Sequence, residues 1–216
     1  EDKDMTITPT ITSKEGVQMA GEYRQAVESG SFQFDGSLTY VDKVDNNNVE
    51  TGGQEFQGHI RGDGQFRLDE TWVWGYDIFR TTHDTYLKKY DISDADTLTS
   101  TAYLQGQRGR NLSLLSAYSF QGLTAADVSG ETPIVPAWWD YSYVGEANSY
   151  GGRFDANADV LAIYRTDGQD TNRLSLEGGY LNPYTTANGQ VITLDTSLRG
   201  DLYYTHDELA DPADPS

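Results

Sequence analysis

The side chains that most often carry catalysis are scattered along this chain. Its three histidines are His59, His83 and His206, and it contains no cysteine. The sequence lacks the Gly-x-Ser-x-Gly elbow, the His-Glu-x-x-His zinc motif and a phosphate-binding glycine loop. Acidic pairs are frequent because acids are frequent, and nothing singles out a pair placed as glycosidases require. We therefore expect no catalytic residues, no bound metal and no cofactor.

One acidic motif has the opening spacing of a calcium loop. Asp155, Asn157 and Asp159 alternate with alanines, but the glycine that should follow is missing and Thr166 stands where the closing glutamate belongs. On a strand, residues two apart share one face, so these three side chains suit a water-filled barrel interior better than a metal site. Residues 91–96 could also hold calcium, although a solvated loop explains them more simply.

The positive charges are conspicuous because they are few. The chain has Lys+Arg 15 against Asp+Glu 34, a formal net charge of −19, which argues against nucleic-acid binding and against docking on an anionic leaflet. Most of the grouped cations flank two short stretches. These candidates for contact with glycolipid phosphates are Arg80, Lys88, Lys89, Arg108 and Arg110. The alternative is ordinary solvated loop charge.

The elements that would position these residues are strands, because apolar and polar residues alternate with period two. Sustained helical periodicity is absent. The clearest alternating runs are residues 32–40, 66–78, 154–164 and 192–204. The pattern predicts an outer apolar face that contains Trp72, Trp74, Ile78, Phe154, Val160 and Leu198. It predicts an inner polar face that contains Asp155, Asn157, Asp159, Asp195 and Arg199.

Glycine-centred turn signals separate these runs and predict consecutive antiparallel hairpins. Their spacing indicates about ten strands. Longer loops are expected at residues 42–53, 81–96 and 124–136. Residues 4–206 should form one partial barrel domain, and residues 207–216 read as an acidic, disordered tail or a cut end.

Strand length separates two architectures. Several runs alternate for about twice the ~5–6 residues of a globular strand, and membrane strands need ~9–11 residues with aromatic side chains at both interfaces. Tryptophans and tyrosines gather near the expected strand ends. They are Trp72, Trp74, Tyr76, Trp138, Trp139, Tyr141, Tyr143, Tyr203 and Tyr204. The alternation fits either an all-β, antiparallel up-and-down meander within a large transmembrane β-barrel or a soluble β-sandwich with long strands.

Specific segments resemble one protein family. The run Asp4-Met-Thr-Ile-Thr-Pro9-Thr-Ile-Thr-Ser-Lys-Glu-Gly16 and the later Gly21-Glu-Tyr-Arg24 are similar to early barrel strands of LptD, the organic solvent tolerance or lipopolysaccharide-assembly protein. Other segments resemble its alphaproteobacterial branch. They are Gly58-His-Ile-Arg-Gly62, Trp72-Val-Trp-Gly-Tyr-Asp77, Asp84-Thr-Tyr-Leu-Lys-Lys-Tyr90, Leu98-Thr-Ser100 and Phe120-Gln-Gly-Leu123. The likeness runs from about Asp4 to Tyr204.

The resemblance implies a translocon of the outer membrane rather than an enzyme. The family's barrel takes lipopolysaccharide (LPS) from a periplasmic bridge, reached through an N-terminal domain that is missing here, and releases it into the outer leaflet. Release occurs through a seam between the first and last barrel strands. The implied partners are LPS, a plug lipoprotein of the LptE type and that bridge. The strands present would be the first part of the barrel.

Pro9 matches a proline of an early strand in that family, which makes it a candidate for the lateral gate. A proline cannot donate to a strand ladder, so beside a seam it would weaken strand pairing where a lipid must pass. A plain edge-strand proline explains the position equally well. Two other functions remain open at this point: a soluble β-sandwich that binds carbohydrate through its Trp and Tyr residues, and a β-rich hydrolase with an acid pair.

Overall fold

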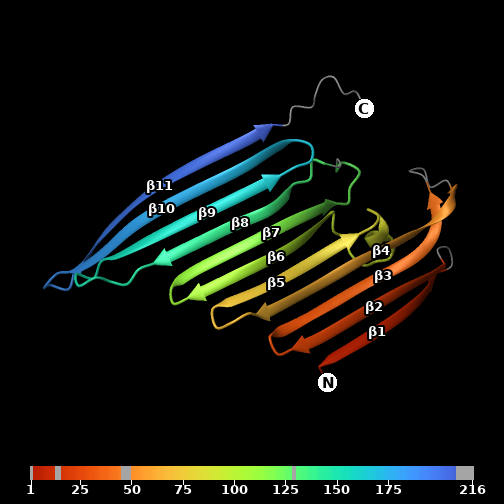
Figure 1. The fold of residues 1–216 in the computed structure, drawn as a ribbon, viewed down its shortest axis with the longest axis horizontal. Coiled ribbons are helices and arrows are strands. Elements are labelled where there is room, and N and C mark those ends of the chain that lie inside the picture. Colours follow the sequence, from red (N-terminus) through yellow and green to blue (C-terminus); the bar gives the residue numbers. More distant parts are fainter. Residues whose placement is uncertain (1, 13–15, 45–49, 128–129, 208–216) are drawn as a thin grey trace. The chain divides into compact units, whose positions relative to one another are not determined.

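The computed structural model describes residues 2–12, 16–44, 50–127 and 130–207, and most of them lie in strands (Figure 1). Eleven strands form one antiparallel sheet in chain order, which confirms the predicted meander and adds one strand to the expected ten. The strands are β1 (Lys3–Thr12), β2 (Gly16–Val27), β3 (Gly30–Val44), β4 (Glu50–Arg67), β5 (Trp72–Thr81), β6 (Thr97–Arg108), β7 (Asn111–Gly122), β8 (Ile134–Val144), β9 (Arg153–Tyr164), β10 (Gln169–Thr185) and β11 (Val191–Asp207). The expected tail beyond Asp207 lies outside the described residues.

The sheet is a simple meander with two edges. In the part of the chain that the structure describes, β1 pairs with β2 alone and β11 pairs with β10 alone. Because the strands make one sheet and not two packed ones, the structure does not support the soluble β-sandwich.

The chain divides into two compact units, which we describe separately. The first contains Glu1–Leu68, Trp74–Ala102 and Ser119–Val128, and the second contains Asp69–Val73, Tyr103–Tyr118 and Ser129–Ser216. In both units, directly opposed residues of neighbouring strands share a face, so the register of β1 to β4 and of β8 to β11 shows which side of the sheet each paired residue faces.

In the first unit the register sorts apolar and polar residues as the sequence predicted. Phe34 lies opposite Tyr23 on β2 and Gly62 on β4, on the apolar face. The next residue, Asp35, lies opposite Glu22 and Arg61 on the polar face. The alternation of apolar and polar residues along β3 therefore continues on the two neighbouring strands, β2 and β4.

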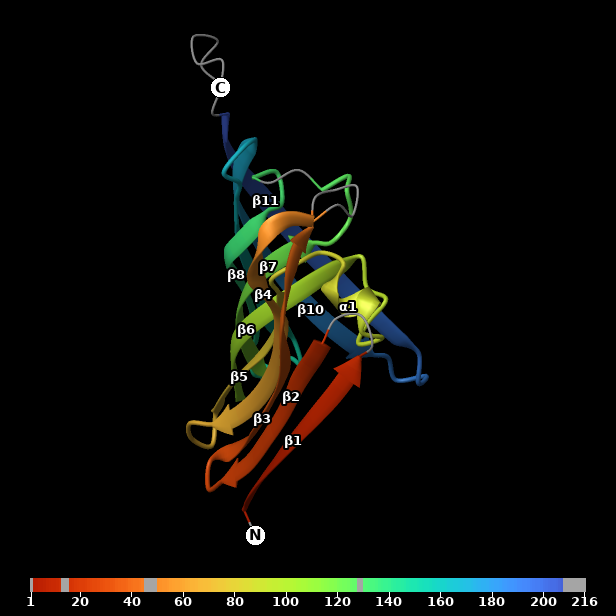
Figure 2. The same cartoon turned by 90° about the vertical axis from the view of Figure 1, so that its right-hand side faces the viewer.

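The main buried cluster of the first unit comes from the connection between β5 and β6, not from the sheet alone. It consists of Tyr86, Leu87, Leu98 and Leu123, with Phe79, Tyr90, Ile92 and Ala95 packed against it. Tyr86 and Leu87 belong to a short helix, α1 (Tyr86–Lys89), that stands to one side of the neighbouring strands (Figure 2). The sequence predicted the loop at 81–96 but not this helix.

Two loop boundaries and one strand were predicted wrongly. The loops expected at 42–53 and 124–136 are shortened, because β3 continues to Val44, β4 begins at Glu50 and β8 begins at Ile134. Residues 45–49 and 128–129 lie outside the described ranges. The alternating run 66–78, which was expected to be one strand, consists of the end of β4, a turn and most of β5.

Asp69 accounts for that turn. Its Oδ1 accepts the backbone N–H groups of Thr71 at 2.7 Å and Trp72 at 2.8 Å. A side chain that bonds its own backbone two residues on is an Asx-turn, which ends a strand locally. The period-two pattern passes through the turn unchanged and hides it.

In the second unit the predicted faces are confirmed for β9 and β11. Phe154, Val160 and Leu198 fall on one face, where Phe154 is 65% and Leu198 81% exposed. Their polar neighbours on the same strands fall on the other. Those residues are Asp155, Asn157, Asp159, Asp195 and Arg199.

Two of the expected girdle aromatics occupy the opposite face. Trp138 lies opposite Leu161 and is two residues from Asp140 on the same strand, so the two side chains share the polar face. Trp139 lies opposite Val160, on the apolar face. The register places Tyr203 opposite Arg173 on the polar face in the same way. Adjacent residues of a strand point to opposite sides, so Trp138 and Trp139 cannot both face lipid.

The apolar face has the dimensions of a membrane band. On β9 it runs from Phe154 to Tyr164, ten positions apart, which is roughly 33 Å at about 3.3 Å per residue. A tilt of about 40° reduces this to about 25 Å, the height of the apolar band in outer-membrane barrels. Phe56 and Phe66 have the same separation along β4. No helix within the described ranges is both long enough and apolar enough to cross a bilayer.

Candidate functional site

The free edge of β1 is the first candidate site, and the hydrogen-bond pattern decides which way Pro9 faces. The N–H of Ala26 donates to the carbonyl oxygen of Asp2 at 2.7 Å. In an antiparallel pair, hydrogen-bonded and non-hydrogen-bonded positions alternate. Counting along the register of the two strands from that bond, Pro9 and Met19 form a non-hydrogen-bonded pair.

The nitrogen of Pro9 therefore points away from β2, to the edge where β1 has no neighbour in the described part of the chain. The β1–β2 ladder loses no hydrogen bond to the proline. A strand that paired with the free edge would find one donor missing. The ring lies on the apolar face with Ile7 and Ile11, both exposed.

Side chains add little to the attachment of β1. All its residues are exposed except the last, Thr12. On the polar face, Arg24 of β2 donates from Nη2 to Asp4 Oδ2 at 2.7 Å and lies 3.4 Å from Glu22. Exposed ion pairs of this kind contribute little to stability, because water and salt screen them. The first strand is thus held mainly by its backbone ladder.

The strands beyond β1 are held on their polar face by α1. Gln18 Nε2 on β2 donates to the Tyr86 hydroxyl at 3.0 Å, and that hydroxyl lies 2.7 Å from Ser37 Oγ on β3. Ser37 Oγ also lies 2.8 Å from His59 Nδ1 on β4. One tyrosine therefore joins a network that spans three strands.

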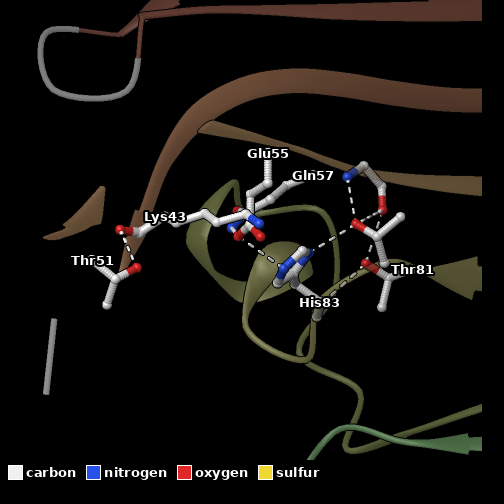
Figure 3. A network of polar contacts seen from close by, with 8 residues as sticks. Lys43, Thr51, Glu55, Gln57, Thr81 and His83 are labelled. Carbon is white, nitrogen blue, oxygen red and sulfur yellow. Dashed lines mark hydrogen bonds and ion pairs between the residues drawn. The ribbon is translucent and has the colours of Figure 1, made fainter. Parts of the chain in front are cut away.

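A second set of contacts fixes the start of the same connection on β4 (Figure 3). His83 Nε2 lies 3.0 Å from Glu55 Oε1, and the Nδ1 atom of the same ring lies 3.0 Å from Thr82 Oγ1. Gln57 Nε2 donates to Glu55 at 2.9 Å, and Thr81 Oγ1 donates to the Gly58 carbonyl at 3.1 Å. The connection is docked at both its first residues and its helix.

Three of the five candidate phosphate ligands lie in or beside this connection. Arg80 Nη2 donates to Ser119 Oγ. Lys88 Nζ donates to Asp96 Oδ1 at 2.6 Å, and this hydrogen bond raises the pKa of Lys88. Lys89 Nζ lies 5.9 Å from the centre of the Tyr90 ring. Arg80 and Lys88 therefore already have protein partners.

The other two candidates belong to the turn between β6 and β7. Arg108 ends β6, Gly109 adopts a positive φ of 62°, and Arg110 precedes β7; both arginines are exposed. Arg80, Lys88 and Lys89 belong to the first unit, whereas Arg108 and Arg110 belong to the second.

The acidic motif of β9 lies in a polar network that needs no metal. Asp159 Oδ2 accepts the indole N–H of Trp138 at 2.8 Å, and Asp159 Oδ1 accepts Nε of Arg173 at 2.9 Å. Among the described residues, no group of three or more His, Cys, Asp or Glu side chains is arranged to hold a metal ion. Sequence reasoning missed both Trp138 and Tyr86 as polar-face residues.

A sequence model of one protein family matches most of the chain. It is described as LptD, LPS transport system D, and it matches residues 55–215 of the 216. The chain belongs to the LptD family. LptD proteins transport LPS to the outer membrane, in which they form a β-barrel, and they are transport proteins and not enzymes.

The LptD match begins within β4, so it does not include β1, β2 or β3, where the first resembling segments and Pro9 lie. A search of curated proteins found no match to the chain. The family assignment confirms the expected outer-membrane location, LPS transport and transmembrane barrel class.

Proposed function

We propose that this sheet is the first part of the barrel of an LPS translocon and that LPS leaves for the outer leaflet past the free edge of β1. The observation that carries the proposal is the orientation of Pro9, whose nitrogen faces that edge. A closing strand paired there would lack one ladder bond at Pro9. Two unpaired edge strands, β1 and β11, agree with a barrel that contains further strands.

The lengths of the connections support an orientation in the membrane. In outer-membrane barrels the long loops are extracellular and the short turns periplasmic. The two longest connections, at 82–96 and 123–133, follow β5 and β7, whereas the turns at 28–29, 68–71 and 109–110 follow even-numbered strands. The longest connection after an even-numbered strand is the one at 145–152, after β8. The α1 connection would then lie on the polar face at the extracellular end of the strands.

This orientation revises the proposed phosphate contacts. Arg80, Lys88 and Lys89 would lie toward the outer leaflet, and Arg108 and Arg110 would lie at the periplasmic end. The first group lies in or beside the connection that follows β5, and the second lies at the turn that follows β6. We assign them to different stages: the arginines of the turn to arriving LPS, and the residues near α1 to departing LPS.

The finer expectations about relatives and partners remain part of the proposal. They are a plug lipoprotein of the LptE type, a periplasmic LPS bridge that docks through a preceding domain, and membership of the alphaproteobacterial branch. Their support is the family assignment, together with the quoted segments at 58–62, 72–77 and 84–90. A polar sheet face is also the surface that a lumen plug would contact.

Replacing Pro9 with alanine tests the edge. The substitution restores one N–H, and a ladder hydrogen bond contributes about 0.5–1.5 kcal/mol, so seam opening should fall by up to roughly tenfold. In cells whose only copy is Pro9→Ala, surface LPS should decrease and outer-membrane permeability should increase, while the barrel assembles normally.

Pro183→Ala is the matched control. Pro183 lies opposite Thr193 on β10, two residues beyond Leu181, where the pairing with β9 ends, so this proline does not belong to the β1 edge. Export should not change in this variant. Normal export by a correctly assembled Pro9→Ala protein, or an equal loss in Pro183→Ala, would remove Pro9 from the gate.

A further inference from the structure

Trp138 is an aromatic side chain on the polar face of the second unit. Its neighbours on that face are Asp140 on the same strand and Asp159, which lies opposite Asp140 on β9. Most large aromatics of β8 to β10 face the other way, as Trp139, Phe154 and Tyr180 do. Trp138 still exposes 36% of its surface.

The indole is held in one orientation. Its N–H donates to Asp159 at 2.8 Å, and Asp159 is in turn fixed by two donors of Arg173. On the other side, the Tyr118 ring of β7 lies 6.1 Å away, centroid to centroid, at an interplanar angle of 48°. A ring fixed by its edge and by one neighbour presents its remaining surface without losing side-chain entropy on binding.

Hydrogen-bonding groups surround the ring on the same face. Ser142 lies opposite Asn157, which lies opposite Glu177, and Glu177 lies opposite Arg199. Together with Trp138 and Asp140 they supply carboxylate and amide acceptors, amide and guanidinium donors, and one apolar platform. The same depression of the surface is lined by Trp138, Asp140, Asn157, Glu177 and Arg199.

We propose that Trp138 is a stacking site for the saccharide portion of LPS as it moves along the polar face. The inference rests on the proposed function and deepens it by naming a residue that guides the cargo. A pyranose ring has an apolar C–H face, which packs on an aromatic plane, and a rim of hydroxyls, which suits carboxylates, amides and guanidinium groups. An acyl chain would find no such match on this face.

The site suits passage rather than retention. One platform and a few exposed polar groups bind a sugar weakly, and a translocation path needs contacts that release their cargo. The apolar neighbour Trp139 donates its indole N–H to Ser113 at 2.9 Å on the other side of the sheet. It therefore provides a control of the same residue type in the same strand.

The test uses the full-length protein as the sole copy in cells, with a photoreactive amino acid at Ser142. Illumination should yield an LPS adduct. Trp138→Ala should lower its yield by roughly threefold to tenfold, or about 0.7–1.4 kcal/mol at about 1.4 kcal/mol per decade. Trp138→Phe, which keeps an aromatic plane, should retain more adduct than Trp138→Ala, and Trp139→Ala should leave the yield unchanged.

The outcomes separate this inference from the proposed function. An equal yield in Trp138→Ala overturns the stacking site and leaves the translocon intact. The absence of any adduct at Ser142, while a probe at Ile11 on β1 still captures LPS, also overturns it. The absence of LPS at both probes would instead contradict the proposed function. Heat-modifiable gel mobility of each variant establishes that the barrel has folded.

Discussion

Two tyrosines of the α1 connection show how differently two buried hydroxyls can act. The Tyr86 hydroxyl contacts Gln18 and Ser37, which lie on two different strands. The Tyr90 hydroxyl is buried without a hydrogen-bond partner in the described part of the chain. The first hydroxyl fixes the connection to the sheet, and the second contributes nothing that we can identify.

Tyr86→Phe should therefore loosen the connection. Removing the hydroxyl leaves buried partners short of one hydrogen bond, which costs about 1–3 kcal/mol. The expected results are a lower urea midpoint for the folded protein in detergent and faster proteolysis within residues 82–96. Tyr90→Phe is the control and should be neutral or slightly stabilising, because it removes an unsatisfied group. Equal behaviour of the two variants would show that the hydroxyl network does not hold α1.

Individual side-chain directions were only partly predictable from the sequence. The face of Asp159 follows from the alternation of β9, since every second residue from 154 to 164 is apolar or aromatic. The face of Trp138 does not, because Trp138 and Trp139 are adjacent and equally apolar. It depends on the register with β9, which shifts between Ile134 and Ala137, beside Pro136. An irregularity of this kind has no period in the sequence.

At the scale of elements, glycines on the apolar face let aromatic rings lie against the sheet. A Cβ added at Gly62 would collide with the ring of Phe34. That ring stacks on Tyr76 at 5.8 Å, and Phe66 stacks on Trp74 at 4.6 Å. These rings make up the aromatic end of the band near the β2–β3 and β4–β5 turns.

Gly62→Ala should destabilise the first unit, because Phe34 must leave its position against β4. Overpacking of this type costs about 1–3 kcal/mol. Gly178→Ala is the matched control on β10, where an added Cβ would meet nothing within 4 Å. Urea titration in detergent should show a lower midpoint for the first variant and no decrease for the second. The opposite order would mean that the rings do not depend on the glycine.

Strands were predicted more successfully than their ends. Alternation located β3, β9 and β11, but it could not reveal the turn at 68–71, where the Asx-turn of Asp69 leaves the phase of the pattern intact. Nor could it reveal α1. The helix has four residues, and its two fully buried residues, Tyr86 and Leu87, are adjacent in sequence. It is therefore too short to display a helical period.

At the scale of the whole chain, the strands of each unit have an apolar face that suits lipid and a polar face that suits water. The apolar face is exposed along its length and ends in aromatic residues about 25 Å apart in height, which suits a bilayer. In the first unit the polar face carries the Arg24–Asp4 ion pair and the docked α1 connection, and in the second unit the polar face carries Trp138. Composition alone hides this division, because the mean hydropathy of −0.62 averages the two faces.

The central claim is that LPS passes the free edge of β1, and capture of LPS in transit tests it most directly. Photoreactive residues would replace Ile7 and Ile11 on the apolar face of β1, with Val160 on β9 as an interior-strand control. We predict LPS adducts at Ile7 and Ile11 that disappear soon after LPS supply is stopped, and none with that dependence at Val160. Supply-dependent adducts that are equal at all three positions, or absent from β1, would contradict the account.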